Sequence, residues 1–123
     1  MAYVLIVEDE PDLVTLLSDQ VGMLGHEVAV ARDGVEGVQR ALERRPDVVV
    51  TDVVMPNMDG PEMLLELRRR PETHDVPVIA LTALTDARTR ARMASLGVIG
   101  FLAKPYSLRD LARQIEQATT PAR

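Results

Sequence analysis

Residues 48–52 read Val-Val-Val-Thr-Asp, a run of β-branched side chains that ends in a carboxylate. Residues 3–9 follow the same plan, because Tyr-Val-Leu-Ile-Val leads directly into Glu8 and Asp9. Continuous apolar runs without alternating polar residues are typical of strands that are buried on both faces of a sheet. The two stretches therefore predict buried parallel strands whose carboxyl ends are acidic.

Further apolar runs and amphipathic stretches surround these two strands. The apolar runs predict strands over residues 27–31, 78–81 and 99–103. Apolar side chains at helical spacing predict helices over residues 11–24, 34–45, 61–70, 86–96 and 108–115. Asp59 and Gly60 indicate a turn into the third helix. The arginines of the fourth helix indicate a solvated face, and they are Arg88, Arg90 and Arg92.

Five strand-helix units in one short chain predict a doubly wound α/β domain, in which five helices cover a five-stranded parallel sheet. Periodicity does not determine the strand order, and we adopt the flavodoxin-like order 2-1-3-4-5 by analogy. The domain is expected to span residues 1–118. Residues 119–123 are expected to be a frayed tail or the start of a linker.

The composition of the 123-residue chain fits one globular domain, with 46% hydrophobic and 27% charged residues. The chain has no cysteine, which excludes thiol chemistry and a cysteine-bound zinc site. A net charge of -5 and only two tyrosines and one phenylalanine argue against direct binding of nucleic acid. No apolar run approaches the roughly 20 residues that span a bilayer. We therefore expect a cytoplasmic protein with no membrane partner.

Polar side chains follow four of the predicted strands, at the edge where open α/β sheets bind ligands. Glu8, Asp9 and Asp52 follow the first and third strands, and Thr82 and Lys104 follow the last two. If the first and third strands are neighbours, repulsion raises the pKa values of the three carboxylates unless a cation binds. Oxygen ligands without histidine or cysteine suit Mg²⁺. A carboxylate nucleophile, a divalent metal and two donors are what phosphoryl transfer to a carboxylate requires.

Each of these residues also has a purely structural interpretation. Acidic residues at strand ends usually form turns or cap helices, and the Thr82 hydroxyl is also suited to closing a turn. Lys104 alone would be interpreted as an ordinary solvated lysine. Their common position at one edge of the sheet favours the functional interpretation.

The sequence resembles the receiver domain of two-component response regulators over residues 2–118. The resemblance rests on five motifs that occur in the order and on the strand-helix rhythm of that family. They are Glu8-Asp9, Asp52, Met55-Pro56-Asn57-Met58-Asp59-Gly60, Thr82-Ala83 and Lys104-Pro105.

The resemblance implies a phosphorylation-controlled signalling switch in a two-component system rather than an enzyme. Asp52 would accept a phosphoryl group from a sensor histidine kinase or a phosphotransfer protein. A downstream output domain or protein would read the resulting change. Mg²⁺ would be bound by Asp9, Asp52 and the backbone carbonyl of Val54, with Glu8 acting largely through metal-bound water.

The resemblance also implies roles for residues around the phosphoryl group. Thr82 and Lys104 would contact its oxygens, and Phe101 matches the aromatic switch position of the family. The Lys104-Pro105 peptide bond would be cis, which an X-Pro bond permits.

Two features of this chain bear on how it would signal. In the family, the side chains at Val54 and Leu84 border the approach of the hydrolytic water. Both are apolar here, which predicts a long-lived phosphorylated state. Receivers that dimerise through the fourth helix, fifth strand and fifth helix commonly carry acidic residues where this chain has Gly97-Val98-Ile99-Gly100, which puts that dimer in doubt.

Three other functions compete with the receiver interpretation. An Mg²⁺-dependent aspartyl-phosphate phosphatase would need a second aspartate two residues after the nucleophile, where this chain has Val54. A flavodoxin-like nucleotide binder would need a glycine-rich phosphate loop after the first strand, where Glu8 and Asp9 would repel phosphate. A degenerate receiver that acts as a constitutive interaction module would not need every phosphorylation residue, yet all are present.

Overall fold

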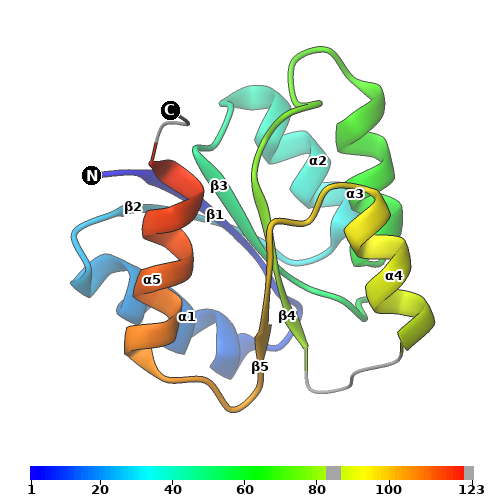
Figure 1. Ribbon diagram of the computed structural model, residues 1–123. Helices are drawn as coiled ribbons and strands as arrows, with labels where there is room; N and C mark the ends of the chain where they lie inside the picture. The colour runs from blue at the N-terminus through cyan, green and yellow to red at the C-terminus, as the bar shows by residue number, and fades with distance from the viewer. Residues whose placement is uncertain (83–86, 121–123) are drawn as a thin grey trace.

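The computed structural model describes residues 1–82 and 87–120 (Figure 1). Strands and helices alternate along this part of the chain. The strands are β1 (Tyr3–Val7), β2 (Glu27–Ala31), β3 (Val48–Asp52), β4 (Val78–Thr82) and β5 (Gly100–Ala103). The helices are α1 (Pro11–Met23), α2 (Gly34–Glu43), α3 (Gly60–Arg69), α4 (Ala87–Ser95) and α5 (Leu108–Thr119).

The five strands form one sheet in the order β2-β1-β3-β4-β5, and all four neighbouring pairs are parallel. This order confirms the doubly wound fold expected from the sequence. The chain first adds β2 on one side of β1 and then adds β3 on the other side. As a result β1 and β3 are neighbours, although α1, β2 and α2 separate them in the chain. The carboxyl ends of β1 and β3 therefore lie side by side at the switch point, where ligands bind in such sheets.

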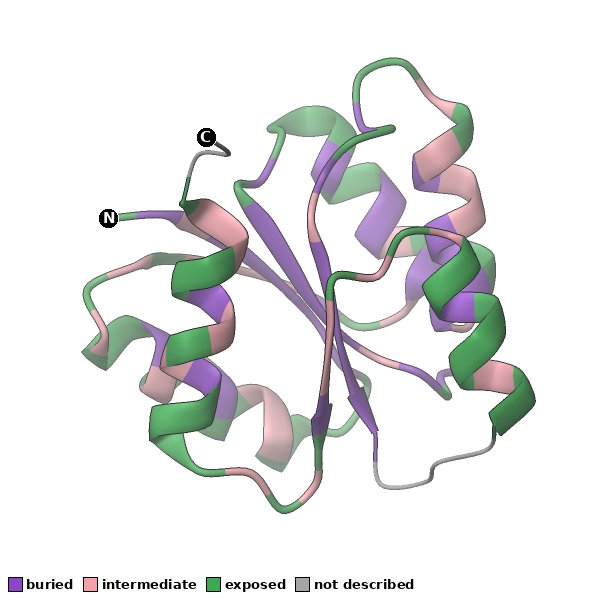
Figure 2. Ribbon diagram, viewed as in Figure 1, coloured by how far each residue is buried: buried purple, intermediate pink, exposed green. Residues whose placement is uncertain are grey.

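Alternate strand residues pack into two cores, one on each face of the sheet. The central strands β1, β3 and β4 are coloured mostly as buried in Figure 2. Leu5 and Val49 belong to the core under α2, α3 and α4, whereas Ile6 and Val50 belong to the core under α1 and α5. The interior of the sheet is thus apolar on both faces, which explains the unbroken hydrophobic runs of its strands. Among the described residues, no helix has the length and apolar character needed to cross a bilayer.

Two helix ends differ from the sequence prediction by more than one residue. The second helix ends at Glu43 instead of residue 45: Arg44 has an extended backbone, and Pro46 disfavours helical backbone at Arg45. The last helix includes Thr119, which the sequence prediction places in the tail. The Thr119 hydroxyl donates to the Ile115 carbonyl at 2.9 Å and so continues the helical turn.

The turn into α3 has the structural role that its Asp-Gly pair predicts. Asp59 is the N-cap, and its side chain accepts a hydrogen bond from Glu62 N at 3.0 Å in a capping box. Gly60 N donates to the Val53 carbonyl at 2.7 Å, which closes the base of the turn.

Gly60→Ala should destabilise the protein by about 1–3 kcal/mol through overpacking. A Cβ at this position would lie 2.8 Å from the Asp52 carbonyl oxygen and 3.1 Å from Val53 Cα, both of which are backbone atoms. Chemical denaturation measures the effect. Gly22→Ala is the matched control, because nothing lies within 4 Å of a Cβ at that helical glycine. Equal stability of the two variants would contradict the prediction.

Candidate functional site

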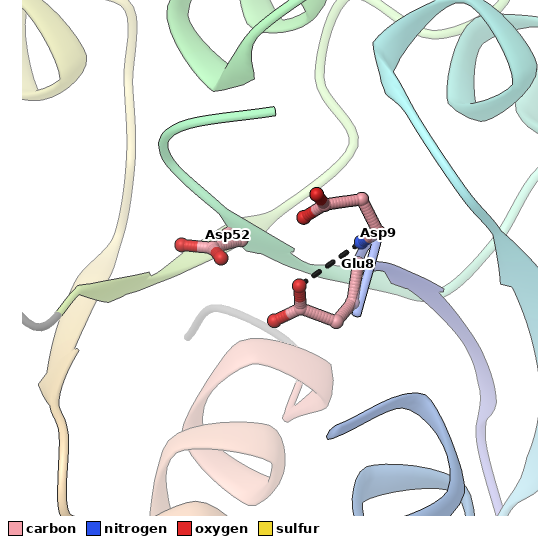
Figure 3. Close-up of side chains that lie close together, drawn as sticks. All are labelled: Glu8, Asp9 and Asp52. Carbon is pink, nitrogen blue, oxygen red and sulfur yellow. Dashed lines mark hydrogen bonds between the residues drawn. The ribbon is translucent and has the colours of Figure 1, made fainter. Parts of the chain in front are cut away.

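The sheet brings together the three carboxylates that the sequence singled out. Glu8 and Asp9 directly follow β1, and Asp52 ends the neighbouring strand β3 (Figure 3). One oxygen from each of the three side chains lies within 4.8 Å of the others. Because the strands leading to them are buried on both faces, these polar groups project only at the open edge of the sheet.

Glu8 is the buried member of the cluster, with 1% of its side chain exposed. Its Oε2 accepts hydrogen bonds from Asp9 N at 2.9 Å and Glu10 N at 3.2 Å. Its Oε1 is buried without a hydrogen bond and lies 3.5 Å from Lys104 Nζ. Burial, with a smaller contribution from the Asp52 charge, raises the pKa of Glu8 to about 7. Lys104 therefore does not fully compensate the cost of burying a negative charge on Glu8.

Asp52 faces this cluster and the lysine together. Its Oδ1 accepts a hydrogen bond from Val53 N at 2.7 Å, and its Oδ2 accepts one from Lys104 Nζ at 3.3 Å. The side chain is 18% exposed, so solvent and small ligands reach it. Asp52 is thus an accessible carboxylate whose Oδ2 is hydrogen-bonded to the Lys104 ammonium group.

Lys104 and Thr82 reach the same edge from β5 and β4. Lys104 N donates to the Thr82 carbonyl at 2.9 Å, which continues the pairing of the two strands by one residue. The Lys104–Pro105 peptide bond is cis. Thr82 is 7% exposed at the end of β4, the neighbour of β3. Leu84 lies outside the described residues.

Two further residues with expected roles lie beside this edge. Val54 follows β3, and 75% of its surface is exposed. Phe101 lies on β5, is partly buried and packs against the core under α2, α3 and α4. The guanidinium carbon of Arg90, on α4, lies 4.6 Å from the centre of the Phe101 ring. This distance is that of a cation–π contact.

The residues present fit a divalent cation with oxygen ligands. Three carboxylates converge, one of them has a buried oxygen without a hydrogen bond, and a single lysine lies against two of them. Such a cation would neutralise the negative charge of the three carboxylates, which the single positive charge of Lys104 does not balance. Hard oxygen ligands without histidine or cysteine are those that Mg²⁺ accepts.

Sequence reasoning missed two contacts next to the site. Arg88, Arg90 and Arg92 are exposed, as the helical pattern indicates, but the pattern does not reveal that the Arg90 guanidinium also contacts the Phe101 ring. The hydrogen bond from Asn57 to Asp33 joins two loops, and the sequence pattern does not predict it. The Asp33-Gly34 pair before a helix was the available signal for the second contact, because aspartate is a favoured N-cap.

Residues 4–116 match the sequence profile of the response regulator receiver domain. The chain belongs to this family. Receiver domains are phosphorylation-controlled switches of two-component signalling. The match includes every strand and helix of this receiver domain apart from the first residue of β1 and the last residues of α5.

Related receiver sequences occur in both regulators and kinases. The chain is 38% identical over 112 residues to a probable transcriptional regulator, ycf27, of Guillardia theta, with 91% of this chain and 43% of the relative covered. It is 33% identical over 117 residues to the hybrid signal transduction histidine kinase D of Dictyostelium discoideum, with 95% of this chain and 8% of the relative covered. The chain thus spans less than half the length of these relatives.

Solved receiver structures share the fold over nearly the full length of both chains. The receiver domain of a sensor histidine kinase from Pseudomonas aeruginosa, which has a magnesium ion coordinated in its active site cleft, is 30% identical with a TM-score of 0.89, covering 96% of this chain and 97% of that one. A chemotaxis protein of Vibrio cholerae is also 30% identical, with a TM-score of 0.90, covering 96% and 98%. Receivers of this shape therefore occur within kinases and in chemotaxis.

Proposed function

We propose that Asp52 accepts a phosphoryl group from a sensor histidine kinase or a phosphotransfer protein, and that phosphorylation changes the surface read by an output domain or protein. The position of Asp52 supports this function most directly, because Lys104 holds its Oδ2 beside the acidic cluster of Glu8 and Asp9. In this proposal the protein acts in the cytoplasm as a signalling switch and not as an enzyme. The receiver domain, whose last helix reaches Thr119, is the switching unit in this proposal.

In the transfer step, an Asp52 carboxylate oxygen attacks the phosphorus of a phosphohistidine. The P–N bond breaks, and its electron pair leaves with the imidazole. Lys104 then exchanges its contact with Asp52 Oδ2 for a contact with a phosphoryl oxygen, and the Thr82 hydroxyl donates to another. Asp9, Asp52 and the backbone carbonyl of Val54 would hold Mg²⁺, with Glu8 acting through metal-bound water, and the bound ion would neutralise charge on the phosphoryl oxygens.

Incubation with acetyl phosphate and Mg²⁺ tests this proposal without knowledge of the kinase. The intact mass should increase by one acid-labile phosphoryl group, and a metal chelator should prevent the increase. A mass that stays unchanged in Mg²⁺ at every acetyl phosphate concentration would contradict the proposal.

Thr82→Ala should leave phosphorylation largely intact but uncouple it from the region around Phe101. Reversing a 1:99 equilibrium takes about 5.5 kcal/mol. Hydrogen bonds to the charged phosphoryl group from Thr82 and Lys104 supply roughly 1.5–3 kcal/mol each, so the loss of either leaves the switch incomplete. NMR spectra of the phosphorylated protein report the change near Phe101. Thr82→Ser keeps the hydroxyl and should behave as the wild type, whereas an equal response near Phe101 in the alanine variant would refute the coupling.

The phosphorylated state should be long-lived, because Val54 and Leu84 offer no polar group to orient a hydrolytic water. Val54→Asn should shorten the lifetime about fivefold, the effect of one hydrogen bond of about 1 kcal/mol in the transition state. Loss of the phosphoryl group from isolated protein in Mg²⁺ measures the lifetime. Val35→Asn introduces the same change at an exposed valine of α2 and should have no effect. A Val54 variant no faster than this control would exclude the proposed role.

A further inference from the structure

A side-chain hydrogen bond links the turn between β3 and α3 to the N-terminus of α2. Asn57 Nδ2 donates to Asp33 Oδ2 at 2.7 Å. Asp33 is also the N-cap of α2, and its Oδ1 accepts a hydrogen bond from Glu36 N at 2.8 Å. One carboxylate therefore caps a helix and holds a neighbouring turn.

A backbone contact accompanies this side-chain bond. Gly34 N donates to the Met58 carbonyl at 2.9 Å. A Cβ at Gly34 would overlap the Met58 carbonyl oxygen, so glycine is required for this close approach. Adjacent residues on both segments thus take part in the contact, which fixes the position of the turn against α2.

The backbone of the turn is strained at its centre. Asn57 has a φ of 65°, and Met58 N donates to the Pro56 carbonyl at 2.7 Å across it. A three-residue turn with positive φ persists where surrounding contacts hold it. Hydrogen bonds, first from Glu36 N and then from Asn57, lower the pKa of Asp33, which keeps it ionised as the acceptor.

Val54 lies between two residues of this turn, Val53 and Asn57, that are held by hydrogen bonds. At the base, Gly60 N donates to the Val53 carbonyl at 2.7 Å. At the tip, Asn57 is held by Asp33 at 2.7 Å. We propose that Asp33 and Asn57 are positioning residues that orient the backbone carbonyl of Val54 toward the metal. This inference rests on the proposed function, in which that carbonyl is a ligand of Mg²⁺.

Two variants break the Asp33–Asn57 bond while keeping the local structure around it. Asp33→Ser retains a hydroxyl that caps α2 but is too short to reach Asn57. Asn57→Gly retains access to positive φ but removes the amide. Each should weaken Mg²⁺ binding about 3- to 10-fold, as expected for the loss of one hydrogen bond. Calorimetric Mg²⁺ titration of the full chain, without any phosphodonor, measures this.

A positioning role makes two further predictions that a general loss of stability does not. The double variant should bind Mg²⁺ no more weakly than the weaker single variant, because both changes remove the same bond. At saturating Mg²⁺, the rate of phosphorylation by acetyl phosphate should equal that of the wild type. Glu36→Gln removes the same charge from the same helical turn and should bind Mg²⁺ as the wild type does.

Wild-type Mg²⁺ affinity in either single variant would overturn the inference. Additive losses in the double variant, or slow phosphorylation that persists at saturating Mg²⁺, would also overturn it. Failure of the proposed function is a different result, because the wild-type protein itself would then bind no Mg²⁺ or accept no phosphoryl group.

Discussion

Asp52→Asn should abolish phosphorylation by acetyl phosphate in Mg²⁺. The amide nitrogen and oxygen of asparagine are poor nucleophiles, and the substitution also replaces a charged metal ligand with a neutral one. Asp52 is the member of the acidic cluster that contacts Lys104 while remaining 18% exposed, so an incoming phosphoryl group reaches it. Intact-mass measurement after incubation should show complete loss of the phosphorylated species.

A variant of Asp9, which is proposed to bind the metal but not to accept the phosphoryl group, distinguishes loss of the metal ligand from loss of the nucleophile. Asp9→Ala should weaken Mg²⁺ binding and slow phosphorylation, but phosphorylation should persist at high Mg²⁺ because Asp52 is intact. Asp47→Asn is a matched control at the opposite edge of the sheet, where Asp47 Oδ2 accepts from Tyr3 N at 2.7 Å. If the Asp52→Asn variant still acquired an acid-labile phosphoryl group, another residue would be the acceptor.

The sequence predicted those parts of the structure that depend on local pattern. The unbroken apolar runs around Leu5 and Val49 predicted buried strands, and both residues are at most 1% exposed. The Asp59-Gly60 pair predicted a helix start, and Asp59 is the N-cap of α3. Convergence of the acidic residues followed once parallel strands and their order were assumed, because parallel strands end at one edge.

Features that depend on contacts between distant segments could not be predicted in the same way. The turn after β3 is held by a hydrogen bond from Asn57 to Asp33, which lies in a different loop. Arg90 covers Phe101 because α4 packs beside β5, which helical spacing alone does not reveal. The burial of Glu8, 1% exposed, likewise results from packing around the end of β1 rather than from the acidic pair itself.

The burial of Glu8 predicts that Mg²⁺ binding strengthens with pH. The pKa of this carboxyl is raised from 4.5 to about 7, chiefly by burial, so the metal-free protein holds a proton on Glu8 below about pH 7. A cation bound beside Glu8 favours the ionised carboxylate, so binding is coupled to loss of that proton. The apparent affinity should therefore rise about tenfold between pH 6 and pH 8, with most of the rise below pH 7, because each pKa unit corresponds to a factor of ten.

The same shift makes the metal-free fold less stable as the pH rises. A carboxyl with a raised folded-state pKa contributes stability that is fully present below about pH 4.5 and is lost as the pH passes through about 7. Mg²⁺ should consequently raise the unfolding midpoint more at pH 8 than at pH 6. Calorimetric Mg²⁺ titration and thermal unfolding at both values measure the two effects independently of any phosphodonor.

Glu8→Gln tests the assignment of this pH dependence to one group. Glutamine carries no titrating proton, so the variant should bind Mg²⁺ more weakly than the wild type at pH 8 and with an affinity that no longer changes between pH 6 and pH 8. Asp9 and Asp52 remain in the variant and keep the rest of the acidic cluster. If the wild-type affinity were the same at both pH values, or if the glutamine variant kept the full tenfold change, Glu8 would not be the group whose proton competes with the cation.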